Sequence, residues 1–175
     1  MRYPTAMSNK PSPRLRLRAT DAEDLTILSA ALQDAIVPVL DISFEPENHR
    51  FIAVFNRFKW EAADRGETDD EGNPVYERTH AGLRVEGATA VRRRGIDPKR
   101  PGAFLQVLAI RAVEGAVEFD FAGGKAIRVE VPKIDVYLDD MGEAWPSTNR
   151  PGHPTEDEAD AGSGEAGASE GGVRG

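Results

Sequence analysis

The chain of 175 residues contains no cysteine and only three histidines. Without thiols it cannot form a disulfide framework, a thiolate zinc site or a cysteine nucleophile. It also lacks a run of about 18 apolar residues, the length that a membrane-spanning helix requires. Its basic start is not followed by the apolar stretch of a secretory signal. We therefore expect a cytoplasmic protein that does not insert into a membrane.

Composition divides the chain into a body and two tails. Residues 1–13 hold three prolines and no periodic apolar pattern, and residues 151–175 hold seven glycines, six acids and one arginine. Such segments bury too little apolar surface to offset their ordering entropy. We expect a disordered basic arm over 1–13, one domain over 14–150, and a disordered acidic glycine-rich tail over 151–175. Within the domain, residues 61–74 predict an exposed acidic loop.

Charge argues against nucleic acid as a partner. The body from residue 19 to residue 150 carries 16 basic and 24 acidic side chains, whereas residues 1–18 carry five basic side chains and no acid. A nucleic-acid-binding domain shows a basic excess over its folded part. The acidic body would instead repel phosphates.

Apolar spacing predicts a helix near each end of the domain. Thr20 and Glu23 fit a capping box, and apolar residues follow at helical spacing up to Ile36, so the first helix is expected to end by Val37, before Pro38. Residues 132–142 predict a second helix, with Pro132 in its first turn. Its buried stripe would consist of Ile134, Tyr137, Leu138 and Met141.

Between these helices, alternating apolar residues predict about six or seven short strands. Residues 39–45 and 50–60 read as a hairpin joined by a Pro-containing turn, and residues 75–94 as one or two strands. Residues 104–113, 117–121 and 127–131 supply the others. For the last two we expect a three-residue loop, Gly123 to Lys125, that pairs Phe121 with Ile127.

Short links between strands favour antiparallel pairing. The predicted fold is therefore α+β: an antiparallel meander or small curled barrel of six to seven strands, with an N-terminal helix and a C-terminal helix. Small pleckstrin-homology-like barrels share this layout, but a comparison of folds carries little functional weight.

Several segments in the same order resemble a known family. They are DAEDLTILSAALQDAIV, FNRFKWE, AVRRRGID, FAGGKAIRVEV and IDVYLDDMGEAW. This pattern resembles an uncharacterised bacterial family, the domain of unknown function numbered 2948, over roughly residues 15 to 150. The resemblance implies a cytoplasmic single-domain protein and assigns no activity, substrate or catalytic residue.

The densest charge cluster is a candidate anion site. Arg92 and Arg94 share one face of a predicted strand, and Lys99 and Arg100 follow after a short loop. Guanidinium groups match phosphate and carboxylate bidentately, so these four side chains are candidate ligand-binding residues. The alternative is a solvated strand end whose arginines pair with the acidic body.

Aromatic residues gather in one predicted strand and suggest a partner-binding surface. Phe55, Phe58 and Trp60 stand next to Arg57, and aromatic and arginine side chains are enriched in interface cores. These four residues are the candidates for binding a partner protein. The alternative is that the aromatic rings pack in the core.

No catalytic, metal or cofactor motif is visible in the sequence. His80 is the weak candidate for a general base, and no histidine has a second ligand at metal-binding spacing. Gly123 and Gly124 lack the spacing of a nucleotide-binding loop. We therefore expect no metal and no cofactor, and we lean away from an enzyme.

Three hypotheses for function follow. The first is a non-catalytic module that binds a protein or an anionic group. The second is an enzyme or binding protein for a small phosphorylated or carboxylated ligand, with an arginine clamp and His80 as base. It requires His80 and Arg92 or Arg94 to share one concave pocket. The third is an assembly role through an exposed strand edge, which predicts a dimer.

Overall fold

The computed structural model describes residues 12–100, 102–147 and 150–151. Apart from Ser12, Pro13 and Pro151, the two predicted tails lie outside these residues. The described chain forms ten strands, one α-helix and two short 3-10 helices. In chain order they are β1 Arg16–Ala19, α1 Ala22–Ala31, β2 Ile36–Pro38, η1 Val39–Asp41, β3 Ile42–Glu45, β4 Arg50–Phe58, η2 Trp60–Arg65, β5 Tyr76–Glu86, β6 Ala90–Arg94, β7 Phe104–Val113, β8 Ala116–Phe121, β9 Lys125–Glu130 and β10 Val136–Ser147.

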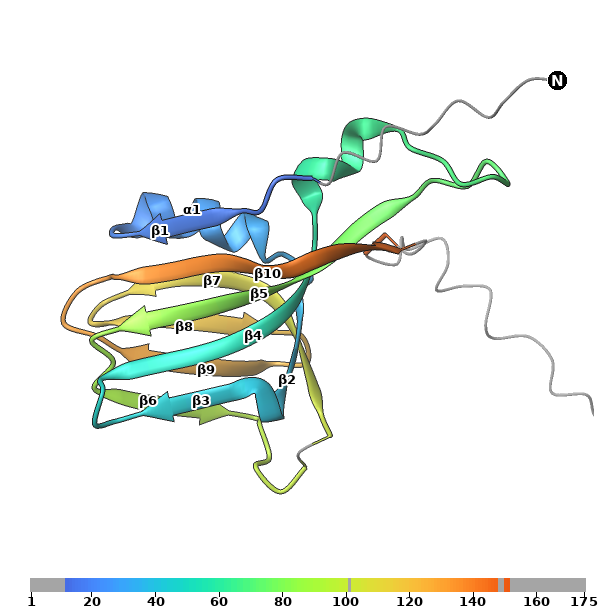
Figure 1. Ribbon diagram of the computed structural model, residues 1–175. Helices are drawn as coiled ribbons and strands as arrows, with labels where there is room; N and C mark the ends of the chain where they lie inside the picture. Colours follow the sequence, from blue (N-terminus) through green and yellow to red (C-terminus); the bar gives the residue numbers. More distant parts are fainter. Residues whose placement is uncertain (1–11, 101, 148–149, 152–175) are drawn as a thin grey trace, which may run out of the picture.

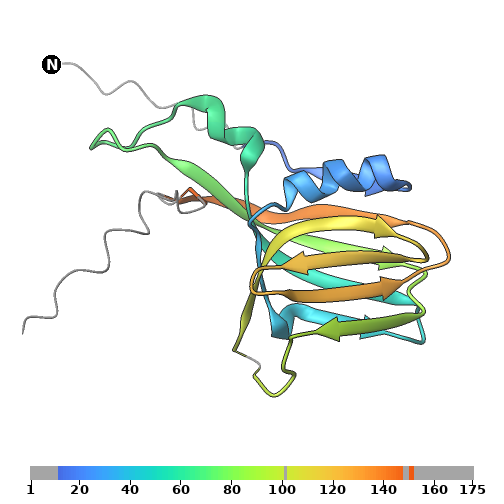
Figure 2. The ribbon, with the colours of Figure 1, turned by 180° about the vertical axis from the view of Figure 1, so that it is seen from behind.

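All ten strands belong to one antiparallel sheet that folds over onto itself. The strand order is β1-β10-β5-β4-β2-β7-β8-β9-β6, and β3 pairs with β4 beside β2. The strands β10, β5, β4 and β3 form one layer, which lies over a second layer of β7, β8, β9 and β6 (Figures 1 and 2). Among the strands described, no pairing joins β1 or β3 to β6, so the sheet is not closed.

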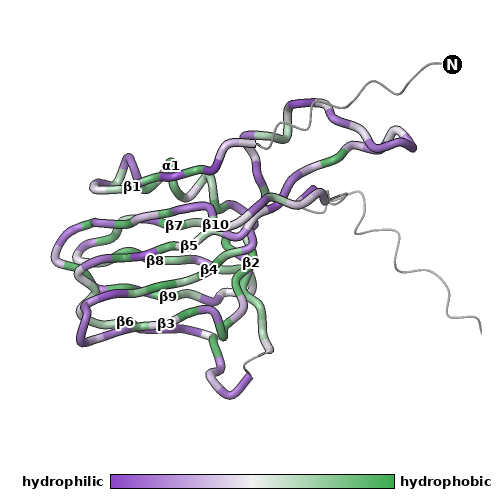
Figure 3. Tube along the Cα trace, viewed as in Figure 1, coloured by the Kyte–Doolittle hydropathy of each residue, from purple (hydrophilic) through white to green (hydrophobic). Residues whose placement is uncertain are grey.

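The apolar core lies between the two layers. Alternate residues of each strand point inward, and the rings of Phe51 on β4 and Phe119 on β8 meet with centroids 5.5 Å apart. Figure 3 shows apolar residues along the strands and mainly hydrophilic residues in the segment from the start of η2 to the start of β5, which includes the predicted acidic loop 61–74. That segment holds η2 and an isolated bridge between Thr68 and Pro74.

The helix α1 covers one side of the gap between the layers, next to β1 and β7 (Figure 1). Leu25 and Leu28 point from it into the core. Its N-cap is Asp21, one residue later than predicted, because the Asp21 side chain accepts the Asp24 amide at 2.8 Å. The helix also ends earlier than expected, and Ile36 belongs to β2.

The predicted C-terminal helix is wrong, because residues 136–147 form β10. Val136, Leu138 and Asp140 are buried, whereas Tyr137 and Asp139 lie on the outer face, so the true period is two. The helical prediction arose because an aspartate occupies an inward position and hides the alternation. The interaction that makes this burial tolerable is described below.

The prediction of six to seven strands in a meander or curled barrel, with two helices, is also wrong. The described residues form ten strands in one open antiparallel sheet and a single α-helix. The short strands β1 and β2 have too few residues to show a hydrophobic period, and the apolar spacing within β10 also fits a helix. The β3–β4 hairpin is confirmed, with Ile42 opposite Ala53.

The predicted hairpin of β8 and β9 is right in its faces and wrong in its register. Phe119 pairs with Ile127 and Phe121 with Lys125, two positions from the expected pairing. A shift of two residues keeps every side chain on its own face, so hydrophobic alternation does not distinguish the two registers. Gly123 and Gly124 adopt φ values of 79° and 71°, which favour glycine in this turn.

We predict that Phe119→Ala lowers the free energy of unfolding by about 3–5 kcal/mol, because it opens a cavity between the two layers. Phe104→Ala makes the same chemical change at a side chain that is 65% exposed, and we expect a change of roughly 0.5 kcal/mol. Urea denaturation of both variants measures the difference. Equal losses would contradict the placement of the core.

Candidate functional site

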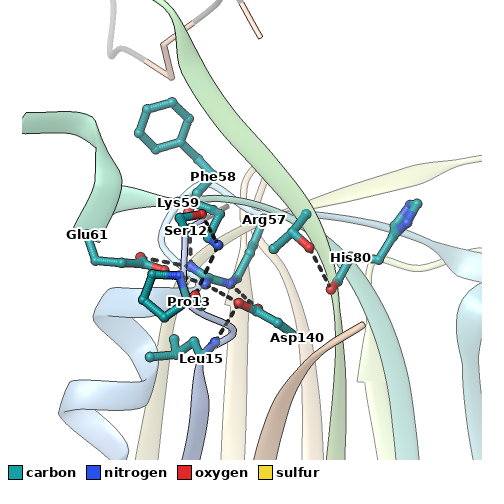
Figure 4. Close-up of polar contacts among 10 residues, drawn as sticks. Ser12, Pro13, Leu15, Arg57, Phe58, Lys59, Glu61, His80 and Asp140 are labelled. Carbon is teal, nitrogen blue, oxygen red and sulfur yellow. Dashed lines mark hydrogen bonds and ion pairs between the residues drawn. The ribbon is translucent and has the colours of Figure 1, made fainter. Parts of the chain in front are cut away.

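Arg57 is a wholly buried arginine at the end of β4. The alternation that points Phe51 and Phe55 into the core also points Arg57 inward, where its side chain has no exposed surface. Its Nε donates to Asp140 Oδ1 at 2.7 Å and its Nη2 to Asp140 Oδ2 at 2.8 Å (Figure 4). This bidentate pair joins β4 to β10 through the interior.

Two further segments complete this ion cluster. Glu61, in η2, accepts from Arg57 Nη2 at 2.6 Å and from Nη1 at 3.1 Å. The backbone amide of Leu15, just before β1, donates to Asp140 Oδ2 at 2.8 Å. Figure 4 shows these groups converging on one point. The cluster therefore fixes the N-terminal segment, β4, η2 and β10 relative to one another.

The ion cluster keeps its members charged. Burial alone would raise the pKa of Asp140 and of Glu61, but the hydrogen bonds from Arg57, the backbone hydrogen bonds and the positive charges of Arg57 and Lys59 together outweigh it and lower both pKa values. Burial likewise opposes the charge of Arg57, and its hydrogen bonds to Asp140 and Glu61 outweigh that penalty and raise its pKa. All three groups are therefore ionised at neutral pH.

Lys59 is a second buried cation, two residues further along the chain. Only 2% of its surface is exposed. Its Nζ donates to Ser12 Oγ at 2.5 Å and to the Pro13 carbonyl at 3.2 Å. It forms no direct ion pair with any described residue, but after Arg57 its positive charge also helps to lower the pKa of Asp140 and of Glu61.

A polar cavity of about 530 Å³ opens beside Lys59. It lies where β10 separates from β5, because the pairing stops at Met141 opposite His80 and resumes only at Trp145 opposite Arg78. Glu77, which lines the cavity, has a buried Oε2 with no hydrogen-bond partner among the described residues. The cavity is lined by Ser12, Pro13, Arg14, Lys59, Glu77, Thr79, Asp140, Gly142, Glu143 and Ala144.

Sequence reasoning missed this cavity and most of the ion cluster. Lys59 and Glu77 carry no motif, and the partners of Arg57 lie four and 83 residues away along the chain. One signal was present: Arg57 follows Phe51, Ala53 and Phe55 at inward positions of the predicted strand. An arginine in an inward row requires a buried carboxylate.

The aromatic strand does not present the surface that the sequence suggested. Phe55 and Phe58 are at most 1% exposed and Arg57 is fully buried, so these three side chains lie in the interior. Trp60 is partly exposed, donates through Nε1 to the Gln33 carbonyl at 3.0 Å, and packs on Phe58. Any partner would meet only Trp60 of the four predicted residues.

The structure places His80 far from the arginine cluster. His80 is exposed on the outer face of β5, where its ring packs 4.8 Å from that of Trp145. Val91 on β6, in the other layer, packs against the core. Because side chains alternate along a strand, Arg92 and Arg94 point outward. The core separates these outer faces, so no concave site brings the histidine and these arginines together.

The arginines instead lie on the side of the molecule opposite α1 (Figures 1 and 2). There β3 and β6 lie at the free margins of the two layers (Figures 1 and 2). A groove of about 150 Å³ opens at this place, which we call the β3–β6 groove. Its lining consists of Val39, Ile42, Phe44, Phe51, Val91, Arg93, Ile96 and Ile127.

The rim of the β3–β6 groove is basic. Arg92 pairs with Glu130 at 3.1 Å, and Arg94 donates to the Gly124 carbonyl at 3.4 Å. Within the part of the chain that the structure covers, Arg93, Lys99 and Arg100 form no ion pair. Of this basic segment only Arg93 lines the groove, whereas Arg92 and Arg94 point outward from β6 and Lys99 and Arg100 follow in the next loop.

The described residues contain neither a metal-binding cluster nor a membrane-spanning helix. No three histidine, aspartate or glutamate side chains converge closely enough to hold a metal ion there. In the same residues, no helix has the length and apolar character needed to cross a membrane.

Comparison with known proteins places the chain in a family. The family model described as "Protein of unknown function (DUF2948)" matches residues 15–153. The chain belongs to this family. The DUF2948 match spans every described strand and confirms the resemblance found in the sequence. No curated protein and no solved structure matches the chain.

We predict strong energetic coupling between Arg57 and Asp140. Arg57→Met or Asp140→Leu alone should cost about 3–5 kcal/mol, because each leaves an unpaired buried charge. The double variant should lose less than the sum of the single losses, with an interaction energy of roughly 2–3 kcal/mol. Urea denaturation of all four proteins measures this. The exposed pair of Arg111 and Glu118, treated in the same way, should show little coupling.

We also predict that acid weakens the fold through the ion cluster. The folded-state pKa values of Asp140 and Glu61 are lowered, so their contribution to stability is complete at neutral pH. It should be lost as the pH falls below about 4, the unfolded-state pKa, toward the lower folded-state values. Denaturation between neutral and acid pH should show a shallower pH dependence for Asp140→Asn than for the wild type. The exposed Asp70→Asn is the control, and an equally shallow curve there would contradict the assignment.

Proposed function

We propose that this protein is a non-catalytic interaction module that binds an extended segment of a partner protein in the β3–β6 groove. The segment would place apolar side chains in the groove and acidic side chains against its arginine rim. The observation that carries the proposal is the coincidence of two free strand margins, an apolar groove and a basic rim at one place.

Free strand margins support this mode of binding. Among the described strands, β3 pairs only with β4 and β6 only with β9. The other side of each strand therefore offers backbone donors and acceptors that an added strand can use. Ile42 and Val91 on these strands are partly buried and line the groove between them. An added strand with alternating apolar residues would cover both.

Charge selects an acidic partner. Arg93 lines the groove, Arg92 and Arg94 are its neighbours on the outer face of β6, and Lys99 and Arg100 lie in the loop that follows, in a chain whose net charge is −8. Carboxylates of a partner segment would form charge-assisted hydrogen bonds with these side chains. They would also be steered to this end of an otherwise acidic molecule.

Two other occupants fit the groove less well. Pairing of β6 with β6 of a second copy would oppose arginines to arginines, and like charges directly opposite each other destabilise a sheet. The chain's own acidic tail, residues 151–175, contains a single aliphatic residue larger than alanine, Val173, and so cannot fill an apolar groove. An enzyme with an arginine clamp and His80 as base is not supported, because those groups lie on opposite layers.

We predict that selection from a displayed library of random peptides against the full chain enriches segments with alternating apolar and acidic residues. The dissociation constant of an enriched peptide, measured by fluorescence anisotropy, should rise about tenfold for each reversed charge in Arg93→Glu and Arg94→Glu, or roughly 1.4 kcal/mol each. Arg65→Glu, an exposed reversal on η2 at the far end of the molecule, should leave it unchanged.

Mapping of the bound peptide provides the second test. Amide chemical-shift changes should concentrate in β3 and β6. Enriched peptides without acidic residues, or shifts confined to other strands, would refute the proposal. A concentration-dependent dimer in sedimentation that Arg93→Glu abolishes would favour the second copy as occupant and would also refute it.

A further inference from the structure

We infer that the cavity beside Lys59 is a separate binding site for a small zwitterion, a molecule with a carboxylate and an ammonium group such as a free amino acid. This site is independent of the β3–β6 groove. It is built from a buried cation that makes no direct ion pair with a described residue, a buried carboxylate oxygen without a donor among those residues, and an interrupted sheet that leaves room between them.

The interruption of the sheet creates the space. Three residues of β10, Gly142, Glu143 and Ala144, lie between the paired positions Met141 and Trp145, and only Thr79 of β5 lies opposite them. Gly142 adopts a φ of 72°, which favours glycine and turns the strand outward. The resulting volume of about 530 Å³ is in the range of small-molecule sites.

Lys59 supplies the anion-binding half of the site. Its ammonium group is almost completely buried and carries three donors. Ser12 Oγ and the Pro13 carbonyl, both neutral, accept two of them. A buried charge is costly unless an opposite charge pairs with it. The nearby carboxylates of Asp140 and Glu61 balance the charge of Lys59 from a distance but give their hydrogen bonds to Arg57, so a carboxylate from a ligand would be the first anion to accept a hydrogen bond from Nζ directly.

Glu77 supplies the cation-binding half. Its Oε2 is buried and accepts no hydrogen bond from a described residue, and Glu77 forms no ion pair with Lys59. An unpaired buried acceptor of this kind carries a desolvation cost that a donor from a ligand would remove. An ammonium group, with three donors, meets this need. Glu143 on the same wall adds a second negative charge.

The mixed signs of the wall define the ligand class. Lys59 and Arg14 are positive, Glu77 and Glu143 are negative, and the charge of Asp140 is paired with Arg57. A phosphate dianion or a dicarboxylate would meet the two glutamates, and a diamine would meet the two cations. A zwitterion satisfies both halves at once. The absence of a large apolar side chain from the lining favours a ligand with a small or polar remainder.

The test uses the full chain and the common free L-amino acids as probes. A ligand that binds only the folded state raises the melting temperature. We expect one or more amino acids to raise it by roughly 2–4 °C. Acetate and methylammonium, each carrying half of the zwitterion, should produce a smaller rise at the same concentration. Amide chemical shifts of Thr79 and Ala144 should move with the effective amino acids.

Two variants assign the halves of the site. Glu77→Gln retains shape and removes the charge that faces the ligand's ammonium, and Lys59→Met removes the counter-ion for its carboxylate. Each should raise the dissociation constant for the effective amino acids at least tenfold, or about 1.4 kcal/mol, and so remove the rise in melting temperature. Arg93→Glu, in the other groove, should retain it.

Several results would overturn the inference. One is that no amino acid changes the melting temperature or the shifts of Thr79 and Ala144. Another is a response that Glu77→Gln leaves intact, which would place the ligand elsewhere even where Lys59→Met fails to fold. A crystal grown with an effective amino acid that holds only water in the cavity would also overturn it. None of these results bears on the β3–β6 groove.

Discussion

The pair of Arg57 and Asp140 is the constraint on which the rest of this structure depends. A charge placed among apolar side chains destabilises a fold unless its partner is held at hydrogen-bonding distance. Here β4 supplies the arginine and β10 the aspartate, 83 residues later. Satisfying this pair determines which residues of β10 face inward. Through Leu15 and Glu61 it also fixes where the N-terminal segment and η2 attach.

The same interaction explains where sequence reasoning failed. Alternation of Val136 and Leu138 is a strand signal only if Asp140 is accepted as the next inward residue, and an isolated acid does not read as inward. Without that residue, Ile134, Leu138 and Met141 fit a helical period equally well. A long-range ion pair therefore overrode the local pattern. Where inward rows are wholly apolar, as in β3 and β4, the hairpin was predictable from the chain alone.

The candidate sites divide in a similar way. The arginine cluster was visible in the sequence because its members are neighbours in the chain, and the structure adds the groove that they border. The cavity beside Lys59 was not visible, because its walls come from the N-terminal segment, β4, β5 and β10. Its defining properties are a buried ammonium group without a direct ion pair among the described residues and an interruption in the pairing of β10 with β5. These are relations between distant residues, and neither periodicity nor spacing encodes them.

The two candidate sites exist because the sheet is incomplete at two places for two different reasons. At one place β10 departs from β5 just beyond Asp140, so the residue that anchors the strand also marks where its pairing ends. At the other, α1 covers one side of the space between the layers, and on the opposite side β3 and β6 do not pair with each other. One opening is lined by charged side chains of both signs, and the other is lined by apolar side chains together with Arg93. Their chemistry differs enough that a ligand suited to one would be rejected by the other, which is why we assign them to different partners.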